Sequence, residues 1–216
     1  MLIIEGTGMA RISILVLTLL ISFSGWGQTP ANLQTIEQAL AANQQLQGQY
    51  QQQRFIAGLS RPLTSSGDFY LIKNQALLWQ QSVPFEQQTL MSQSGIDVYT
   101  NHVKQPQSSQ QAKLSQSISQ TVLALMSGDL KRQSELFDVR LNTEPQWPLW
   151  QLQLTPKGGM FAKVLANIEV SGNQGDVLTL KVMENSGDHT ETRFIQTSPL
   201  TQVPELLKGL DNRESK

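Results

Sequence analysis

The sequence has 216 residues, contains no cysteine and carries a formal net charge of −1. A chain without cysteine has neither disulfides nor thiolate ligands, and a nearly neutral chain lacks the basic surface with which nucleic-acid-binding proteins hold phosphates. These values exclude a disulfide-stabilised scaffold, a thiol enzyme and an electrostatic nucleic-acid binder.

The N-terminal segment has the three parts of a secretory signal. Residues 9–11 give a positive start, residues 12–23 are almost wholly apolar, and small residues follow. The apolar run is shorter than the roughly 20 residues of a membrane-spanning helix, which favours a cleaved signal over an anchor. We predict a start at Met9, a signal peptide within residues 1–27 and one exported domain over residues 28–216.

The remaining chain changes between a helical period and a period of two. A helix is predicted over residues 29–42, with Thr29 as its cap and Pro30 at its first position. From Gly48 the alternation predicts short strands that are separated by Pro, Ser and Gly turns. These strands are expected over residues 49–59, 68–74, 76–81, 89–92 and 96–100.

A helical pattern returns at residues 108–126, where one stripe is apolar and the other face carries Ser, Gln and Lys. Residues 129–136 are predicted to form a second, shorter helix. Residues 160–167 fit either a turn of helix or a strand. The remaining strands are expected over residues 137–142, 149–154, 168–170, 177–183 and 192–195.

This order of elements predicts an α+β fold with one sheet. A single antiparallel sheet of about nine to eleven short strands has to curl, and its apolar face needs a cover. The cover would be the N-terminal helix and the inserted helix pair, which we interpret as a two-helix lid. The enclosed space is either a packed core or a cavity for an apolar ligand, and composition does not distinguish the two.

No pattern in the sequence predicts catalysis. The two histidines, His102 and His189, lie in polar segments and lack the spacing of a metal-binding helix. The sequence has no nucleophile elbow, phosphate-binding glycine loop or dinucleotide fingerprint, and the serines before Asp68 are ordinary turn residues. We therefore expect a protein that is not an enzyme and uses neither cofactor nor metal.

Three segments follow one another in a characteristic order. Residues 67–79, GDFYLIKNQALLW, contain a glycine, an alternating apolar strand, a basic residue and a closing tryptophan. A tryptophan-to-proline step spans residues 79–84, and residues 150–159, WQLQLTPKGG, contain a Leu-Thr-Pro-Lys strand end. In content, order and spacing these segments resemble the LolA family, the periplasmic carriers of outer-membrane lipoproteins, over nearly all of the mature chain.

The resemblance implies an incomplete antiparallel β-barrel whose mouth is covered by helices, with a hydrophobic cavity for acyl chains. It implies a periplasmic carrier, expected as a monomer, that moves lipoproteins from an inner-membrane ABC transporter to an outer-membrane LolB-like receptor. The alternatives are a LolA-like carrier of a free lipid or glycolipid precursor, and a lipid-sensing or protein-binding module. The expected cavity residues are Phe69, Leu71, Leu77, Trp79, Leu114, Ile118, Val122, Leu125, Trp150 and Leu152.

Lys73 occupies the basic position of this resemblance, and strand alternation places it on the face of Phe69 and Leu71. In the family the basic residue is usually an arginine followed by proline, and it bonds lid-helix carbonyls to hold the empty carrier closed. Here Lys73 precedes Asn74, and an ammonium is a point donor where a guanidinium can fork. The resemblance implies a weaker or differently gated latch; the alternative is that Lys73 only extends to the rim of the sheet.

Overall fold

The computed structural model describes residues 32–43, 45–142, 144, 146–208 and 210. The predicted signal peptide, residues 1–27, lies outside them. Eleven strands form one antiparallel sheet in the order β6-β5-β4-β3-β2-β1-β11-β10-β9-β8-β7. The helices are α1 (Leu33–Ala42), α2 (Ser109–Met126), α3 (Leu130–Leu136), α4 (Phe161–Val164) and α5 (Glu205–Lys208).

The sheet consists of two meanders, and within each meander strands that are consecutive in the chain are neighbours. The first meander contains β1 (Gln45–Phe55), β2 (Leu63–Ile72), β3 (Ala76–Val83), β4 (Gln87–Ser92), β5 (Gly95–Thr100) and β6 (Val103–Lys104). The second contains β7 (Phe137–Asn142), β8 (Leu149–Pro156), β9 (Leu165–Asn173), β10 (Asp176–Glu184) and β11 (His189–Pro199).

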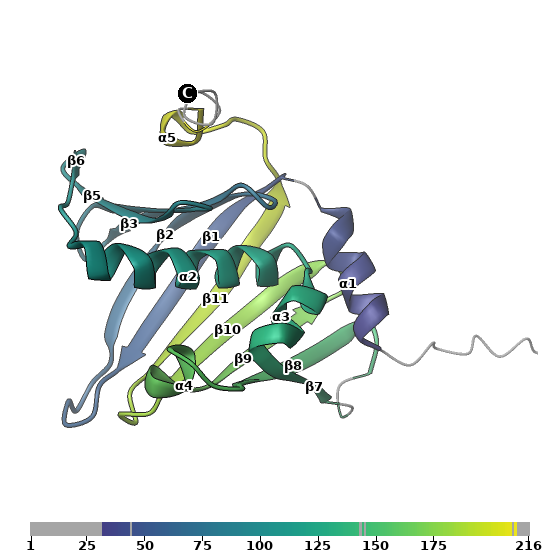
Figure 1. Cartoon of the computed structure of the whole chain (residues 1–216). Helices are drawn as coiled ribbons and strands as arrows, with labels where there is room; N and C mark the ends of the chain where they lie inside the picture. Colours follow the sequence, from purple (N-terminus) through teal and green to yellow (C-terminus); the bar gives the residue numbers. More distant parts are fainter. Residues whose placement is uncertain (1–31, 44, 143, 145, 209, 211–216) are drawn as a thin grey trace, which may run out of the picture.

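One pair of strands joins the two meanders. β1 pairs antiparallel with β11, from Leu46 opposite Pro199 to Phe55 opposite His189. The two outer strands, β6 and β7, do not pair with each other, so the sheet curves without closing (Figure 1). The predicted fold class, a single curved antiparallel sheet that forms an incomplete barrel with helices over it, is confirmed.

Side-chain caps fix where the helices begin, and they correct three predicted boundaries. The first helix begins at Leu33 rather than at residue 29, because Asn32 is extended and its Oδ1 accepts a hydrogen bond from the Thr35 amide at 2.8 Å. Thr29 and Pro30, the predicted cap and first residue, lie outside the described residues. Ser108 and Asp129 are likewise the caps of α2 and α3 rather than their first residues.

Several strand predictions are also corrected. The strand predicted over residues 68–74 spans Leu63–Ile72, so Lys73 and Asn74 lie in the turn that follows. The strand predicted over residues 49–59 ends at Phe55, because a turn follows in which Gly58 has a φ of 89°. Residues 160–167, which fitted either a helix or a strand, contain both, since α4 is followed directly by the start of β9. The last strand extends from His189 to Pro199, well beyond the predicted residues 192–195.

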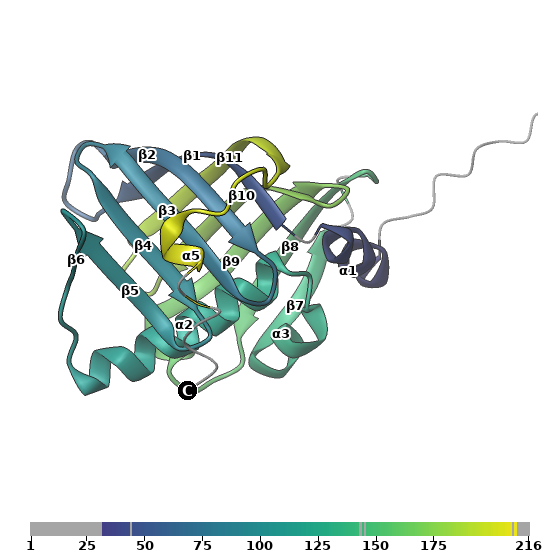
Figure 2. The same ribbon diagram turned by 90° about the horizontal axis from the view of Figure 1, so that it is seen from above.

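The two faces of the sheet carry separate apolar clusters. The inner, concave face packs against α1 to α4, while α5 covers part of the outer face over β3 and β4 (Figures 1 and 2). The outer cluster is small and consists of Ala76, Leu78, Leu90, Tyr99 and Leu207. The inner cluster is much larger and draws residues from both meanders.

Candidate functional site

The candidate site is the concave face of the sheet with the helices that cover it. Alternation along β2 and β3 turns Phe69 and Leu71 inward, opposite Trp79 and Leu77. Most of the predicted cavity residues meet here in one apolar cluster. Phe69, Leu71, Leu77, Leu125, Trp150 and Leu152 are its buried members, and Trp79, Ile118 and Val122 are partly buried against it. Leu114 lies in α2, and its side chain is outside the part of the chain that the structure describes.

These side chains fill the concave face as a packed core. Leu77 and Leu152 have no exposed surface, and Leu71 is 2% exposed. An acyl chain could reach them only if the covering helices moved away from the sheet, because a packed interior leaves few voids larger than a water molecule. The structure therefore represents a closed arrangement of the candidate site.

The sequence prediction found Trp150 and Leu152 of β8 but missed the inner-face residues of α1, β9, β10 and β11. Ile36 and Leu40 of α1 point into the same cluster, with Val170 from β9, Leu180 from β10 and Phe194 from β11. The period of two along these strands was the available signal for their inner residues. It could not be used before the pairing of the two meanders was known.

Trp150 shows how tightly the second meander packs. Its indole Nε1 donates to the backbone oxygen of Gln174 at 2.9 Å, so the buried ring has its polar atom paired. Gly172 faces it on β9, where a β-carbon would lie 2.0 Å from the ring. The absence of a side chain at Gly172 is thus what lets the large ring lie flat on the sheet.

Tyr50 and Trp79 form the middle of the inner face. Their ring centroids are 4.8 Å apart, and Phe194 approaches Trp79 edge-on at 6.2 Å. Burial, with a smaller contribution from the carboxylate of Asp68, raises the pKa of Tyr50 to about 12. The environment around this hydroxyl therefore disfavours charge strongly.

Lys73 connects the sheet to the first helix. Its Nζ donates a hydrogen bond of 2.6 Å to the backbone oxygen of Ala41, in the last turn of α1. Carbonyls in the last turn of a helix lack partners within the helix and lie at its negative end, so they suit a cation. Burial lowers the pKa of the Lys73 ammonium. The bonded carbonyl belongs to α1, not to the two inserted helices.

Asn74 holds the neighbouring turn against α2. Its φ is 59°, a left-handed conformation that asparagine tolerates and that a proline ring would forbid. Its amide donates to the Ser127 hydroxyl at 3.0 Å, and its carbonyl accepts from the Gln93 side chain at 2.8 Å. We call α1, α2 and the turns at residues 73–75 and 93–94 the helix end of the molecule.

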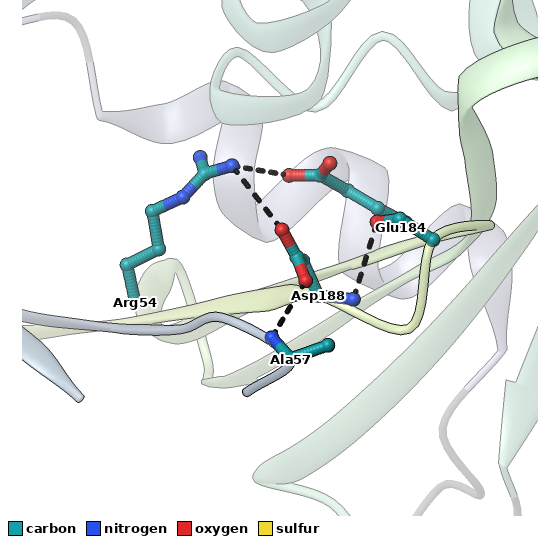
Figure 3. Close-up of polar contacts among 5 residues, drawn as sticks. Arg54, Ala57, Glu184 and Asp188 are labelled. Carbon is teal, nitrogen blue, oxygen red and sulfur yellow. Dashed lines mark hydrogen bonds and ion pairs between the residues drawn. The ribbon is translucent and has the colours of Figure 1, made fainter. Parts of the chain in front are cut away.

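The opposite ends of the central strands are tied by charges. Arg54 lies 3.0 Å from the carboxylate of Glu184 and 4.0 Å from that of Asp188. The other carboxylate oxygen of Asp188 accepts from the Ala57 amide at 2.9 Å (Figure 3). These contacts join the β1–β2 loop, residues 56–62, to the β10–β11 turn, residues 185–188. We call this loop and this turn together the hairpin end.

Other features of the molecule give little support to alternative sites. A recess of about 310 Å³ is lined mostly by polar residues of β1, β2 and β11, among them Gln51, Glu191 and Arg193. Among the described residues, no group of three or more His, Cys, Asp or Glu side chains could hold a metal ion. None of the helices that the structure describes is long and apolar enough to cross a membrane.

Comparison with known proteins gives one family and several solved structures. Residues 41–205 match the family described as outer membrane lipoprotein carrier protein LolA. No curated protein matches the sequence. A LolA superfamily protein from Nitrosomonas europaea is similar over 81% of this chain and 94% of its own, with 12% identity and a TM-score of 0.45.

Two further structures show a similar degree of likeness. A putative outer membrane lipoprotein-sorting protein domain from Vibrio parahaemolyticus has 7% identity and a TM-score of 0.41, over 84% of this chain and 97% of its own. The MucA/MucB complex from Pseudomonas aeruginosa contains a chain with 15% identity and a TM-score of 0.47, over 81% of this chain and 58% of its own.

Proposed function

The chain belongs to the LolA family of outer membrane lipoprotein carrier proteins, and from this premise we propose that it carries lipoproteins across the periplasm. In this proposal it binds their acyl chains between the concave face of the sheet and the helices, and moves them from the inner to the outer membrane. Residues 1–27 would direct its export and be removed.

The observation that carries the proposal is the shared apolar cluster of the concave face. It draws side chains from α1, from α2 and from both meanders, so separating the helices from the sheet would open a continuous apolar surface. Each methylene of an acyl chain that entered this surface would contribute about 0.8 kcal/mol of transfer free energy. The ligand would thereby replace the contacts that the helices lose.

We propose Lys73 as the latch of the closed arrangement. Its hydrogen bond to Ala41 links the β2–β3 turn to α1, and it would have to break when α1 moves. An ammonium forms a single directional bond here and can be released without losing a paired fork of hydrogen bonds. Asn74, which holds Ser127, would release α2 in the same movement.

The carrier would depend on partners for the energy of loading. The sequence contains no phosphate-binding loop, so this chain has no visible nucleotide site of its own. Membership of the family supports an inner-membrane lipoprotein-releasing ABC transporter as donor and an outer-membrane LolB-like receptor as acceptor. A carrier of this kind needs no catalytic residues, cofactor or metal.

One observation favours a second candidate function. The Lys73-Asn74 turn replaces the family's usual Arg-Pro pair, and Asn74 holds a backbone conformation that proline cannot adopt. A changed latch is what a changed cargo would require. The second candidate is therefore a carrier of the same type for a free lipid or a glycolipid precursor.

Native mass spectrometry tests both candidates. The full chain, expressed with its own N-terminal segment in a Gram-negative host, would be isolated from the periplasm and measured under gentle conditions before lipid extraction. A bound triacylated polypeptide supports the lipoprotein carrier, and a bound free lipid supports the second candidate. Repeated preparations without lipid would contradict both and favour a protein-binding module.

A matched pair of α2 variants controls the experiment. Ile118→Asp places a charge on the inner face of the helix, where Ile118 packs against the apolar cluster. Ala112→Asp places the same charge at an exposed position of the same helix. We expect bound lipid to disappear from the first variant and to remain in the second.

A further inference from the structure

Trp79 has a buried hydrogen-bond donor without an acceptor. Its ring lies on the concave face against Tyr50 and Phe194, and its Nε1 is enclosed yet has no hydrogen-bond partner. An indole N–H buried in this way destabilises the empty protein, because it has given up water without gaining another acceptor. Trp150, the fully buried tryptophan of the inner cluster, has its N–H paired with Gln174.

The missing group at Trp79 must be an acceptor. Among the described residues, the other buried side-chain atoms without partners are the oxygens Gln133 Oε1 and Asn167 Oδ1, which are acceptors themselves. The Gln133 side chain is in addition held by its nitrogen, which donates to the backbone oxygen of Thr121 at 3.1 Å. Trp79 is therefore the position on the inner face where a ligand oxygen would satisfy a donor.

Uncharged polar side chains occupy the next position on the inner face beyond Tyr50, whose ring contacts Trp79. Gln52 follows Tyr50 by two residues on β1, so it shares the inner face, and it is opposite both Ser65 on β2 and Thr192 on β11. Its Nε2 donates to the Thr192 hydroxyl at 3.0 Å. Thr192 is only 2% exposed, so its hydroxyl faces the interior.

The row formed by Gln52, Ser65 and Thr192 suits an uncharged group of a ligand. Gln52, Ser65 and Thr192 carry no charge, and Arg54, the next inward position on β1, is occupied by the carboxylates of Glu184 and Asp188. A phosphate or carboxylate would find no free cation in the row itself. A carbonyl oxygen needs only the neutral donors that Trp79, Gln52 and Thr192 supply.

We infer that Trp79, Gln52 and Thr192 form a subsite for the ester and amide carbonyls that join the acyl chains to the polar end of the ligand. The inference rests on the proposed function, since it assigns one part of the same site. The Trp79 N–H donates to one carbonyl oxygen, and the amide and hydroxyl of the neighbouring row donate to another. The acyl chains then extend toward Leu71 and Leu77 at the helix end, and the polar end of the ligand faces the hairpin end.

A pair of synthetic ligands tests this subsite. One is a peptide whose N-terminal cysteine carries a dipalmitoyl glyceryl group with two ester bonds; the other is its dialkyl ether analogue, which has no ester carbonyls but the same chains. The full chain would be titrated with each. Because one hydrogen bond of ordinary strength changes affinity by about fivefold and the ether lacks both carbonyls, we expect the wild type to bind the ester about 25-fold more tightly than the ether.

Trp79→Phe keeps an aromatic ring but removes the N–H. We expect it to lower the affinity for the ester about fivefold, because the second carbonyl keeps its donors, and to leave the affinity for the ether unchanged. Thr192→Val, which removes only a hydroxyl, should weaken ester binding selectively to a smaller degree. Phe194→Leu is the matched control, since it alters ring packing against Trp79 and should affect both ligands equally.

Two results overturn the inference while leaving the carrier intact. Equal affinities of the wild type for ester and ether would show that the carbonyls find no donor. Equal losses for both ligands in Trp79→Phe would reduce Trp79 to a packing residue. Failure of the wild type to bind either ligand is a different result, which would contradict the proposed function itself.

Discussion

The helix end and the hairpin end of this molecule are held together in opposite ways. At the helix end, Leu77 is fully buried under the helices, and the link from Lys73 to α1 is a single hydrogen bond. At the hairpin end, Arg54 holds two carboxylates, while Leu59 and Leu63 are 53% and 54% exposed. One end thus depends on apolar burial and the other on charges.

This difference indicates which end can open. Apolar burial is non-directional and scales with the area removed from water, so the chains of a ligand can replace the chains of the protein. The ion pairs of Arg54 are directional, and no apolar ligand can replace them. We therefore expect α1 and α2 to move while the hairpin end keeps the two meanders in place.

The largest expected effect comes from Leu77→Ala, which removes buried methyl groups from the floor of the helix end. Such substitutions lower the free energy of unfolding by about 2–5 kcal/mol. The measurement is urea unfolding of the variant and of Leu178→Ala, whose side chain is 38% exposed on the outer face. Equal losses in the two variants would contradict the claim that the helix end depends on burial.

The next largest expected effect is on the pH dependence of stability, and it tests whether the Tyr50 hydroxyl is shielded from water. The pKa of Tyr50 is raised to about 12, so between its ordinary value near 10 and pH 12 the unfolded chain ionises while the folded chain does not. Stability from this residue is complete below pH 10 and is lost as the pH rises toward 12. We expect Tyr50→Phe to flatten the alkaline decline in unfolding free energy, and an unchanged decline would place Tyr50 in a wetter environment than the structure shows.

Lys73→Met tests the latch and should have a smaller effect on stability. Loss of one hydrogen bond to Ala41 is expected to lower the unfolding free energy by about 0.5–1.5 kcal/mol. Hydrogen exchange should accelerate in the amides of α1 while those of β10 and β11 stay unchanged. Lys113→Met, at an exposed position of α2, is the matched control. A Lys73 variant with unaltered exchange in α1 and unaltered ligand release would not be consistent with a latch.

Arg54→Gln should have the smallest effect on stability. The Arg54 and Glu184 side chains are 45% and 30% exposed, and an exposed pair of this kind contributes at most about 1 kcal/mol, less in high salt. Arg140→Gln removes an even more exposed pair with Asp138 and serves as control. If Arg54→Gln accelerated hydrogen exchange in α1 as strongly as Lys73→Met, the two ends would not be independent.

Local patterns were sufficient to predict part of the candidate site. Alternation along β2 could assign Phe69 and Leu71 to one face from the sequence alone, and their pairing with Trp79 and Leu77 of β3 is regular. The apolar stripe of α2 likewise predicted that Ile118 and Leu125 face the sheet. In both cases the periodicity of the sequence correctly identifies which face of the element is buried.

The remaining part of the site depends on contacts between distant segments. Phe194 joins Tyr50 and Trp79 only because β11 pairs with β1, and no local pattern specifies a partner so far along the chain. The same applies to Lys73: its parity predicts an inward direction, whereas the docking of α1 decides that it meets Ala41. The unpaired N–H of Trp79 depends on all of its neighbours and leaves no trace in the sequence.

The pairing of β1 with β11 also has a consequence for the kinetics of folding. Every other neighbouring pair of strands is consecutive in the chain and can form as a local hairpin, whereas Tyr50 must find Phe194. Contacts between such distant residues require the closure of a long loop before they add stability, which slows folding. Each meander is thus expected to assemble first on its own, and the sheet to be completed only after the last strand has been synthesised and has reached the first.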